Sequence, residues 1–391
     1  MRHIDSNIEI DLKDYDDDAK HHAYVENLSH IEPSDAKQLL DIGVDIEEND
    51  RIGTFIQKDK SVIHCKSKQN GIEVTGISDA VKKHQWLSDY MWKNISPETD
   101  KFTGQVKEKP HDGYFIHAQP GIKTKDPIQS CLYIAKDGFS QNVHNIVIAE
   151  EDSELHIITG CATAPHLING LHIGISEFYV KKRAKLTFTM IHDWGERVNV
   201  RPRTVMQVEE GGVIISNYIS LRPVGSLQMC PTTHLIGAGA VARFNSILVA
   251  NHGSYLDVGS RVILDAPHTR AEIISRGISS GGSIIARGNL EGRAAGIKAH
   301  LECKGLILNN GLMKAIPELT GYVPGVEMSH EAAVGKIDQQ EIEYLMARGL
   351  DEDAAISTIV RGFLNVDIEG LPKGLKEKLD KVVTETQKDM M

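Results

Sequence analysis

A series of short apolar runs between residues 115 and 325 constrains the fold of this chain more than any other feature. Each run is four to six residues long and is bounded by Gly, Asn, Asp or Pro, as β-strands are. About a quarter of the chain, from Gly211 to Gly311, contains 15 of its 34 glycines, which permit positive φ angles at tight corners. The pattern predicts a mainly β fold, either a β-solenoid or a β-sandwich.

The solenoid is the favoured alternative, although the sequence has no clean repeat period. No helical pattern interrupts the region, and flat, stacked turns need small residues such as those between Ala286 and Gly296. The flanking segments differ in character, so we expect three domains: residues 1–114, 115–334 and 335–391.

The N-terminal segment is predicted to be mixed and helical. Ser78 is a candidate N-cap for a helix spanning roughly Asp79 to Asn94. An acidic cluster near the start is interpreted as a solvated, mobile end: Asp14, Asp16, Asp17 and Asp18.

The C-terminal segment is predicted to be helical throughout. Asp338 caps one helix that ends at Gly349, and Asp351 opens a second helix with an apolar stripe. A third helix is expected after Pro372. So small a helical set cannot bury its apolar faces alone, so it should pack on the β region or on a partner.

Composition excludes several functional classes. The 391 residues have a net charge of −11, which argues against a general binder of nucleic acid or anionic membranes. No apolar run approaches the roughly 20 residues that span a bilayer, and the start of the chain lacks a secretory pattern. We therefore expect a cytoplasmic protein. The five scattered cysteines, without CxxC spacing, do not suggest a disulfide framework: Cys65, Cys131, Cys161, Cys230 and Cys303.

Cys303 and the pair His330–Glu331 are the strongest candidates for metal chemistry. A thiol, an imidazole and a carboxylate are all ligands for iron or zinc. One chain offers too few of them here for a closed four-ligand site, but two chains related by a twofold axis would offer enough. The sequence therefore predicts a metal centre shared between subunits. The plainer alternatives are a buried structural cysteine and a capping or salt-bridge pair.

Several segments together resemble the SufB/SufD family of iron–sulfur cluster assembly scaffolds. The most specific are the C-terminal stretches 328–338, 344–355 and 359–363. The Gly-Cys motif at 159–165 and the His-Asp-Trp segment at 191–194 match more weakly. The N-terminal zone is similar to the archaeal SufB-like (SmsB-like) branch at 43–46, 55–57 and 86–90.

The resemblance implies a right-handed parallel β-helix flanked by helical domains, and a non-catalytic scaffold. Cys303 matches the cysteine at the family's cluster-forming interface, Glu331 matches its carboxylate, and His330 matches the histidine that SufD supplies. Because this chain has His330 and Glu331 side by side, a homodimer is expected. The implied cargo is an iron–sulfur cluster, with 4Fe–4S favoured over 2Fe–2S.

The resemblance also implies partners. The C-terminal helices of the family dock a SufC-like ABC-type ATPase, and this chain itself has no GxxxxGK[ST] phosphate loop. A sulfur donor and apo-protein acceptors complete the expected set.

Cys161 is implied to be the sulfur acceptor, which receives sulfur as a persulfide. Such a cysteine needs a depressed pKa or a nearby base, and His156, His166 and His172 are near in sequence. Asp193 and Trp194 are candidates to line a sulfur route, with ordinary core packing as the alternative. The chain reads His-Asp-Trp where bacterial relatives often have Gln-Asn-Trp, which leaves the implied sulfur tunnel open.

Two other functions remain as alternatives. Parallel β-helices also form carbohydrate-active enzymes that use paired carboxylates, for which this chain offers Asp257, Asp265, Glu272 and Glu291. The chain is only 5% aromatic, so sugar-stacking surfaces would be scarce. The other alternative is a metal-free adaptor of an ABC-type ATPase. Cys65, Cys131 and Cys230 are interpreted as structural.

Overall fold

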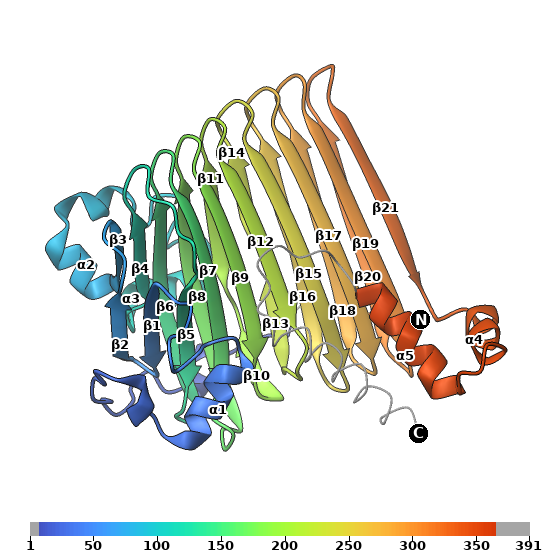
Figure 1. The fold of residues 1–391 in the computed structure, drawn as a ribbon, viewed down its shortest axis with the longest axis horizontal. Coiled ribbons are helices and arrows are strands. Elements are labelled where there is room, and N and C mark those ends of the chain that lie inside the picture. Colours follow the sequence, from blue (N-terminus) through green and yellow to red (C-terminus); the bar gives the residue numbers. More distant parts are fainter. Residues whose placement is uncertain (1–7, 365–391) are drawn as a thin grey trace.

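Two long β-sheets dominate the computed structural model, which describes residues 8–364. Their strands lie side by side from the N-terminal to the C-terminal end of the molecule, and successive turns line the upper edge in Figure 1. The helix expected after Pro372 lies outside the described residues.

Sheet 1 has ten strands, and all of its pairings are parallel except that between its first two strands. In spatial order these are β2 (Ser61–Ser67), β1 (Gly53–Lys58), β5 (Ile128–Ile134), β7 (Glu154–Thr163), β9 (Lys185–Asp193), β12 (Val213–Ser220), β15 (Val241–Asn251), β17 (Arg270–Ser280), β19 (Lys298–Leu308) and β21 (Glu327–Gly335).

Sheet 2 has eleven strands and is parallel except where its first two strands pair. It contains β3 (Ile72–Gly76), β4 (Tyr114–Ala118), β6 (Phe139–Ala149), β8 (Asn169–Val180), β10 (Arg197–Val200), β11 (Arg203–Val208), β13 (Ser226–Met229), β14 (Thr232–Leu235), β16 (Tyr255–Leu264), β18 (Ser283–Gly292) and β20 (Leu312–Gly321). The first strands of both sheets thus lie in the N-terminal segment.

The pairing register reveals a repeat. Along sheet 1, the residues that face each other are Lys185, Val213, Val241, Arg270, Lys298 and Glu327, which are 28 or 29 residues apart. Each repeat passes once through each sheet, and about eight turns fill residues 115–335. The predicted parallel β-solenoid is confirmed.

The core lies between the two sheets and runs the length of the solenoid, from Phe55 at one end to Met313 at the other. A second apolar cluster covers the outer face of sheet 1, where Ile42 after α1 (Pro33–Asp41) and Val360 of α5 (Glu352–Leu364) pack. The remaining helices are α2 (Ile77–Lys83), α3 (Lys101–Glu108) and α4 (Gln339–Met346), with 3-10 turns at Leu12–Asp14, Leu28–His30 and Gln85–Asp89.

The single helix expected over 79–94 is wrong. The chain forms α2, then a 3-10 turn, and Trp92 adopts a φ of 60° that no helix allows. The reason is tertiary: the buried carboxylate of Glu177 on β8 accepts the backbone N–H groups of Trp92 and Asn94, both at 2.6 Å. These bonds fix a loop where local propensity favours a helix.

The C-terminal helices follow the sequence pattern more closely. The Asp338 side chain accepts a hydrogen bond from the backbone N–H of Gln340, and Asp351 does the same for Ala354. Gly349 adopts a φ of 97° after α4, as a helix-ending glycine does. Both helices lie at the C-terminal end of the solenoid in Figure 1.

Residues 15–25, which we call the N-terminal strap, correct another expectation. Asp16 pairs with Lys136 at 2.7 Å, and the neighbouring Asp17 and Asp18 pair with Lys109 and Lys60. In the strap, the backbone N–H of Val25 also donates a hydrogen bond to the carbonyl of Ile63 on β2, at 2.7 Å. The acidic cluster is therefore solvated, as expected, but it is attached to the rest of the molecule.

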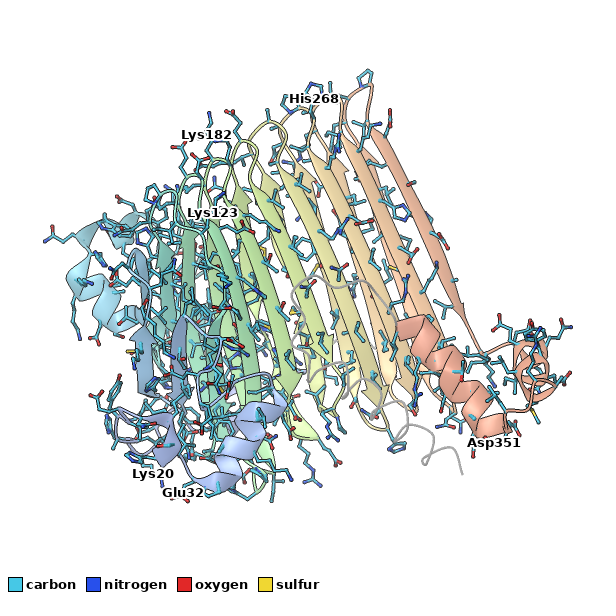
Figure 2. All side chains as sticks on the ribbon, viewed as in Figure 1. Lys20, Glu32, Lys123, Lys182, His268 and Asp351 are labelled. Atoms are coloured by element: carbon cyan, nitrogen blue, oxygen red, sulfur yellow. The ribbon has the colours of Figure 1, made fainter. Side chains whose placement is uncertain are left out.

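Charged turns line one edge of the solenoid, where Lys123, Lys182 and His268 are labelled in Figure 2. Arg183 in one turn binds Asp152 in the preceding turn, and Lys182 binds Glu210 in the following turn at 3.0 Å. Opposite charges in adjacent turns therefore favour the stacking of successive repeats.

Candidate functional site

Cys303 lies on β19, one strand from the C-terminal edge of sheet 1, and its side chain belongs to the solenoid core. It is fully buried, between Ser275 on β17 and Ala332 on β21. Burial raises the pKa of its thiol to about 11; nearby Glu302 raises it further, and Arg276 opposes the shift. At neutral pH the cysteine is therefore protonated in this conformation.

His330 and Glu331 lie on the last strand, β21, and both are exposed. His330 pairs in register with Leu301, and Glu331 pairs with Glu302. Because successive side chains of a strand point to opposite faces, His330 shares the face of Cys303, whereas Glu331 lies on the outer face. The structure brings Cys303 and His330 onto adjoining strands of one face, and it separates Glu331 from both.

Glu331 already has a partner on that outer face. Its carboxylate binds Lys304 Nζ at 3.0 Å, and Lys304 also binds Glu302 at 3.1 Å. The two carboxylates raise the pKa of Lys304. The sequence interpretation missed Lys304, although its signal was present: charged residues at 302 and 304 flank an uncharged Cys303, as expected for a strand with one buried face.

Residues 8–364 contain no group of three or more His, Cys, Asp or Glu side chains placed to hold a metal ion. A cysteine and carboxylates, which are a soft and a harder type of metal ligand, both lie near the C-terminal edge. However, one chain in this conformation does not present both kinds of ligand to the same space.

Cys161 lies on β7 and is also fully buried. Burial raises the pKa of its thiol well above the usual range. Its register partners are Leu132 on β5 and His192 on β9. The histidine next to Cys161 in the sheet is thus His192, which the sequence interpretation did not single out, although it lies within the quoted His-Asp-Trp segment.

His192 belongs to a buried cluster of imidazoles and aromatic rings. Its Nδ1 is 2.7 Å from the hydroxyl of Tyr218, and the Trp194 ring lies 5.3 Å from His192 and 5.0 Å from His172. Burial lowers the pKa of His172 to about 3 and that of His192 strongly. Both imidazoles are therefore neutral at physiological pH.

The hydrogen bonds of Gln141 assign the tautomer of His172. The Gln141 amide nitrogen donates to the carbonyls of Asp59 and Tyr133, so its oxygen faces His172 Nδ1 at 3.0 Å. That nitrogen must therefore be the protonated one, which leaves Nε2 with a free lone pair. Trp194 is buried, and its indole N–H has no hydrogen-bond partner among the described residues.

Comparison with known proteins gives the family. A family model described as "SUF system FeS cluster assembly, SufBD core domain" matches residues 132–363, more than half of the chain. An "Iron-sulfur cluster assembly SufBD family protein" of Archaeoglobus fulgidus is 49% identical over 358 residues, covering 91% of this chain and 96% of the relative. The chain belongs to the SufBD family.

Other SufBD relatives support the expected branch. A SufBD family protein of Methanothermobacter thermautotrophicus is 45% identical over 389 residues, 98% of this chain and 95% of its own. "Iron-sulfur cluster assembly protein SufB" of Bacillus subtilis is 28% identical over 364 residues, 90% of this chain and 78% of its own. These two archaeal relatives are thus more similar to this SufBD protein than the bacterial SufB is.

The carbohydrate-active alternative finds no support in the geometry. Each of its four candidate carboxylates is tied to arginine: Asp257 to Arg287, Asp265 to Arg293, Glu272 to Arg243, and Glu291 to Arg261 and Arg293.

All five cysteines of this SufBD protein are free thiols, with Cys131 buried, Cys65 partly buried and Cys230 exposed. No described helix is long and apolar enough to span a membrane.

Proposed function

We propose that this SufBD protein is a non-catalytic scaffold that builds a labile iron–sulfur cluster between two copies of itself. The observation that supports this most is the last strand, β21. Within the described part of the chain it pairs with β19 on one side only, and almost every residue along it is exposed. An exposed, unpaired strand edge is a template for pairing with another chain; His330 and Glu331 lie on this edge strand, and Cys303 lies on the strand next to it.

Two copies joined there would supply two Cys303 thiolates and two Glu331 carboxylates, with His330 as a further ligand or as a donor that orients Glu331. Four thiolates hold clusters in electron carriers. A mixed set exchanges its ligands more readily, which suits a scaffold that must release its product. The cluster is then cargo, with 4Fe–4S favoured.

Building the cluster requires a change of conformation. Cys303 is buried and protonated, so the last turn of the solenoid must open before its sulfur meets iron. A SufC-like ABC-type ATPase is the proposed source of this motion, docked on the segment after Gly335. Three apolar side chains of α4 and the following turn are exposed, as a docking surface requires: Tyr344, Met346 and Leu350.

Cys161 is the proposed entry point for sulfur. In this step its thiolate attacks the terminal sulfur of a donor persulfide, the donor's S–S bond breaks, and the donor leaves as a thiolate, so no net oxidation occurs. The thiol must first lose its proton; because burial disfavours both a thiolate at Cys161 and an imidazolium at the neighbouring His192, this step requires the buried site to open to water. The sulfur then passes toward the Cys303 edge, and apo-proteins receive the finished cluster.

Anaerobic reconstitution tests the assignment. Iron and sulfide bound per chain are measured by ultraviolet–visible and Mössbauer spectroscopy for the parent, Cys303→Ser and Glu331→Gln. We expect both variants to lose most of the cluster. Cys230→Ser, which removes an exposed thiol between β13 and β14 of sheet 2, is the matched control and should retain it. A Cys303→Ser protein that binds as much cluster as the parent would show the site to be wrong.

A further inference from the structure

A row of charges on the outer face of sheet 1 connects Glu331 to helix α5. Glu331 binds Lys304 at 3.0 Å, Lys304 binds Glu302 at 3.1 Å, and Glu302 also binds Arg276 on β17. The Arg276 guanidinium lies 6.0 Å from the ring centroid of Phe363, in α5. The row thus runs from a candidate iron ligand to a helix in the proposed ATPase-docking segment.

We propose that Arg276, Glu302 and Lys304 form a latch that keeps the Glu331 carboxylate away from iron until α5 moves. The inference rests on the proposed function, since it assumes that Glu331 binds iron. Lys304 and Arg276 are positioning residues in this scheme and do not touch the cargo.

The charges of the row are balanced, and this balance makes the latch exchangeable. Two cations, Arg276 and Lys304, neutralise two carboxylates, Glu302 and Glu331. If Glu331 leaves, Lys304 keeps its contact with Glu302, so Lys304 still has an oppositely charged partner. Glu331 is the most exposed member of the row, and exposed ion pairs are weak. Iron can therefore displace Lys304 without a large penalty.

Arg276 supplies the link to the helix. Its side chain is largely buried between Glu302 and Phe363. A shift of α5 that draws Arg276 away would leave Glu302 with Lys304 as its only cation. Lys304 would then turn fully to Glu302, and Glu331 would be released. Motion at the docking helix is thus converted into availability of a ligand, through contacts that are continuous in the structure.

The same two strands contain an ion pair that lacks this connection. Lys298 on β19 binds Glu327 on β21 at 3.1 Å, and both side chains are highly exposed. Lys298→Met removes one positive charge between the same strands without touching the latch. It therefore separates the loss of the latch from the general electrostatic effect of removing a cation. Glu327→Gln is the equivalent control for Glu302→Gln.

The experiment measures Fe²⁺ affinity of the purified full-length apo-protein by anaerobic titration calorimetry, without sulfide. Lys304→Met should bind Fe²⁺ about threefold more tightly than Lys298→Met does, the scale of an exposed ion pair. Glu302→Gln leaves Glu331 as the one carboxylate of the latch that binds Lys304. This variant should therefore bind Fe²⁺ more weakly than Glu327→Gln does. Phe363→Ala changes no charge but removes the ring that holds Arg276 beside Glu302. It should therefore tighten binding, and this gain should vanish in the Lys304→Met background.

Two failures are distinguishable. If the parent binds Fe²⁺ no better than Glu331→Gln, the proposed function fails and the latch fails with it. If the parent shows Glu331-dependent binding but Lys304→Met matches Lys298→Met, or Phe363→Ala matches the parent, the latch is refuted and the scaffold function stands.

Discussion

Burial sets the protonation of the residues that matter most. The Cys303 thiol, with its pKa raised to about 11, stays protonated behind the last turn. Such a thiol is a poor metal ligand and a poor nucleophile, because both roles need the thiolate. The pKa of His172 shifts in the opposite direction, down to about 3, which keeps the imidazole neutral inside the core. Both shifts have the same cause, the cost of a charge in an apolar interior.

The lowered pKa of His172 predicts acid sensitivity. An unfolded histidine gains a proton below about pH 6.5, whereas folded His172 stays neutral down to about pH 3. The unfolded state therefore binds more protons in this window, and stability is lost as pH falls from 6.5 toward 3. His172→Gln should reduce the slope of unfolding free energy against pH by up to about 1.4 kcal/mol per unit.

Urea unfolding of parent and variant at several pH values between 7 and 4 provides the measurement. His166→Gln, at an exposed histidine, controls for the loss of an imidazole in general. Equal slopes for the parent and His172→Gln would contradict the prediction.

At the scale of elements, helix α1 and strand β7 fit together at a glycine. A β-carbon placed on Gly160 would lie 2.5 to 2.8 Å from three atoms of Ile42, the fully buried residue that follows α1. The neighbouring Cys161 is thus covered on the outer side by a helical segment that only glycine admits. The sequence alone does not name the element that approaches Gly160 so closely.

Gly160→Ala should destabilise the protein by about 1–3 kcal/mol, as overpacking does. Thermal unfolding of the single and double variants checks this, because Ile42→Ala should relieve part of the strain and make the two changes non-additive. Gly104→Ala in α3 is the control and should change stability in the opposite direction, because its β-carbon would meet nothing closer than 3.7 Å. Alanine in a helix interior stabilises by roughly 0.5–1 kcal/mol. Additive effects at 160 and 42 would disprove the contact.

Particular elements show what the sequence could and could not predict. The strands were visible because apolar runs and turn residues are local signals. The repeat was hidden because residues at equivalent inward-facing positions differ in type. One such row across successive strands of sheet 1 contains Cys161, His192, Ser220, Leu248 and Gly277. The opposite facing of Cys303 and Glu331 depends on the register between β19 and β21, which is not a local property.

At the scale of the whole molecule, the two ends of the solenoid differ. At the N-terminal end, the strap bonds to the free side of β2, and α2 and α3 lie nearby (Figure 1). At the other end, β21 has a strand on one side only, β19, within residues 8–364, and nearly all of its side chains are exposed. Protection should therefore decrease from the N-terminal repeats to the last one.

Hydrogen–deuterium exchange measures this gradient. Amides of β21 should exchange fastest among the strands of sheet 1 at low protein concentration, because few buried contacts hold them. Raising the concentration should slow exchange in β21 while leaving β9 and β12 unchanged, since pairing of two copies protects the edge alone. Exchange in β21 that is slow and independent of concentration would argue against dimerisation through this strand.

The difference between the two ends has a consequence for how large an assembly can grow. Fibril growth by stacking solenoids needs a receptive strand at both termini of each unit. Here the strap bonds to the β2 side, so within the described residues the open end of sheet 1 is β21, and a molecule that pairs through β21 uses up that end. Such a contact between identical surfaces is self-limiting and stops at a pair. The N-terminal strap thus protects against aggregation as well as stabilising the first repeats.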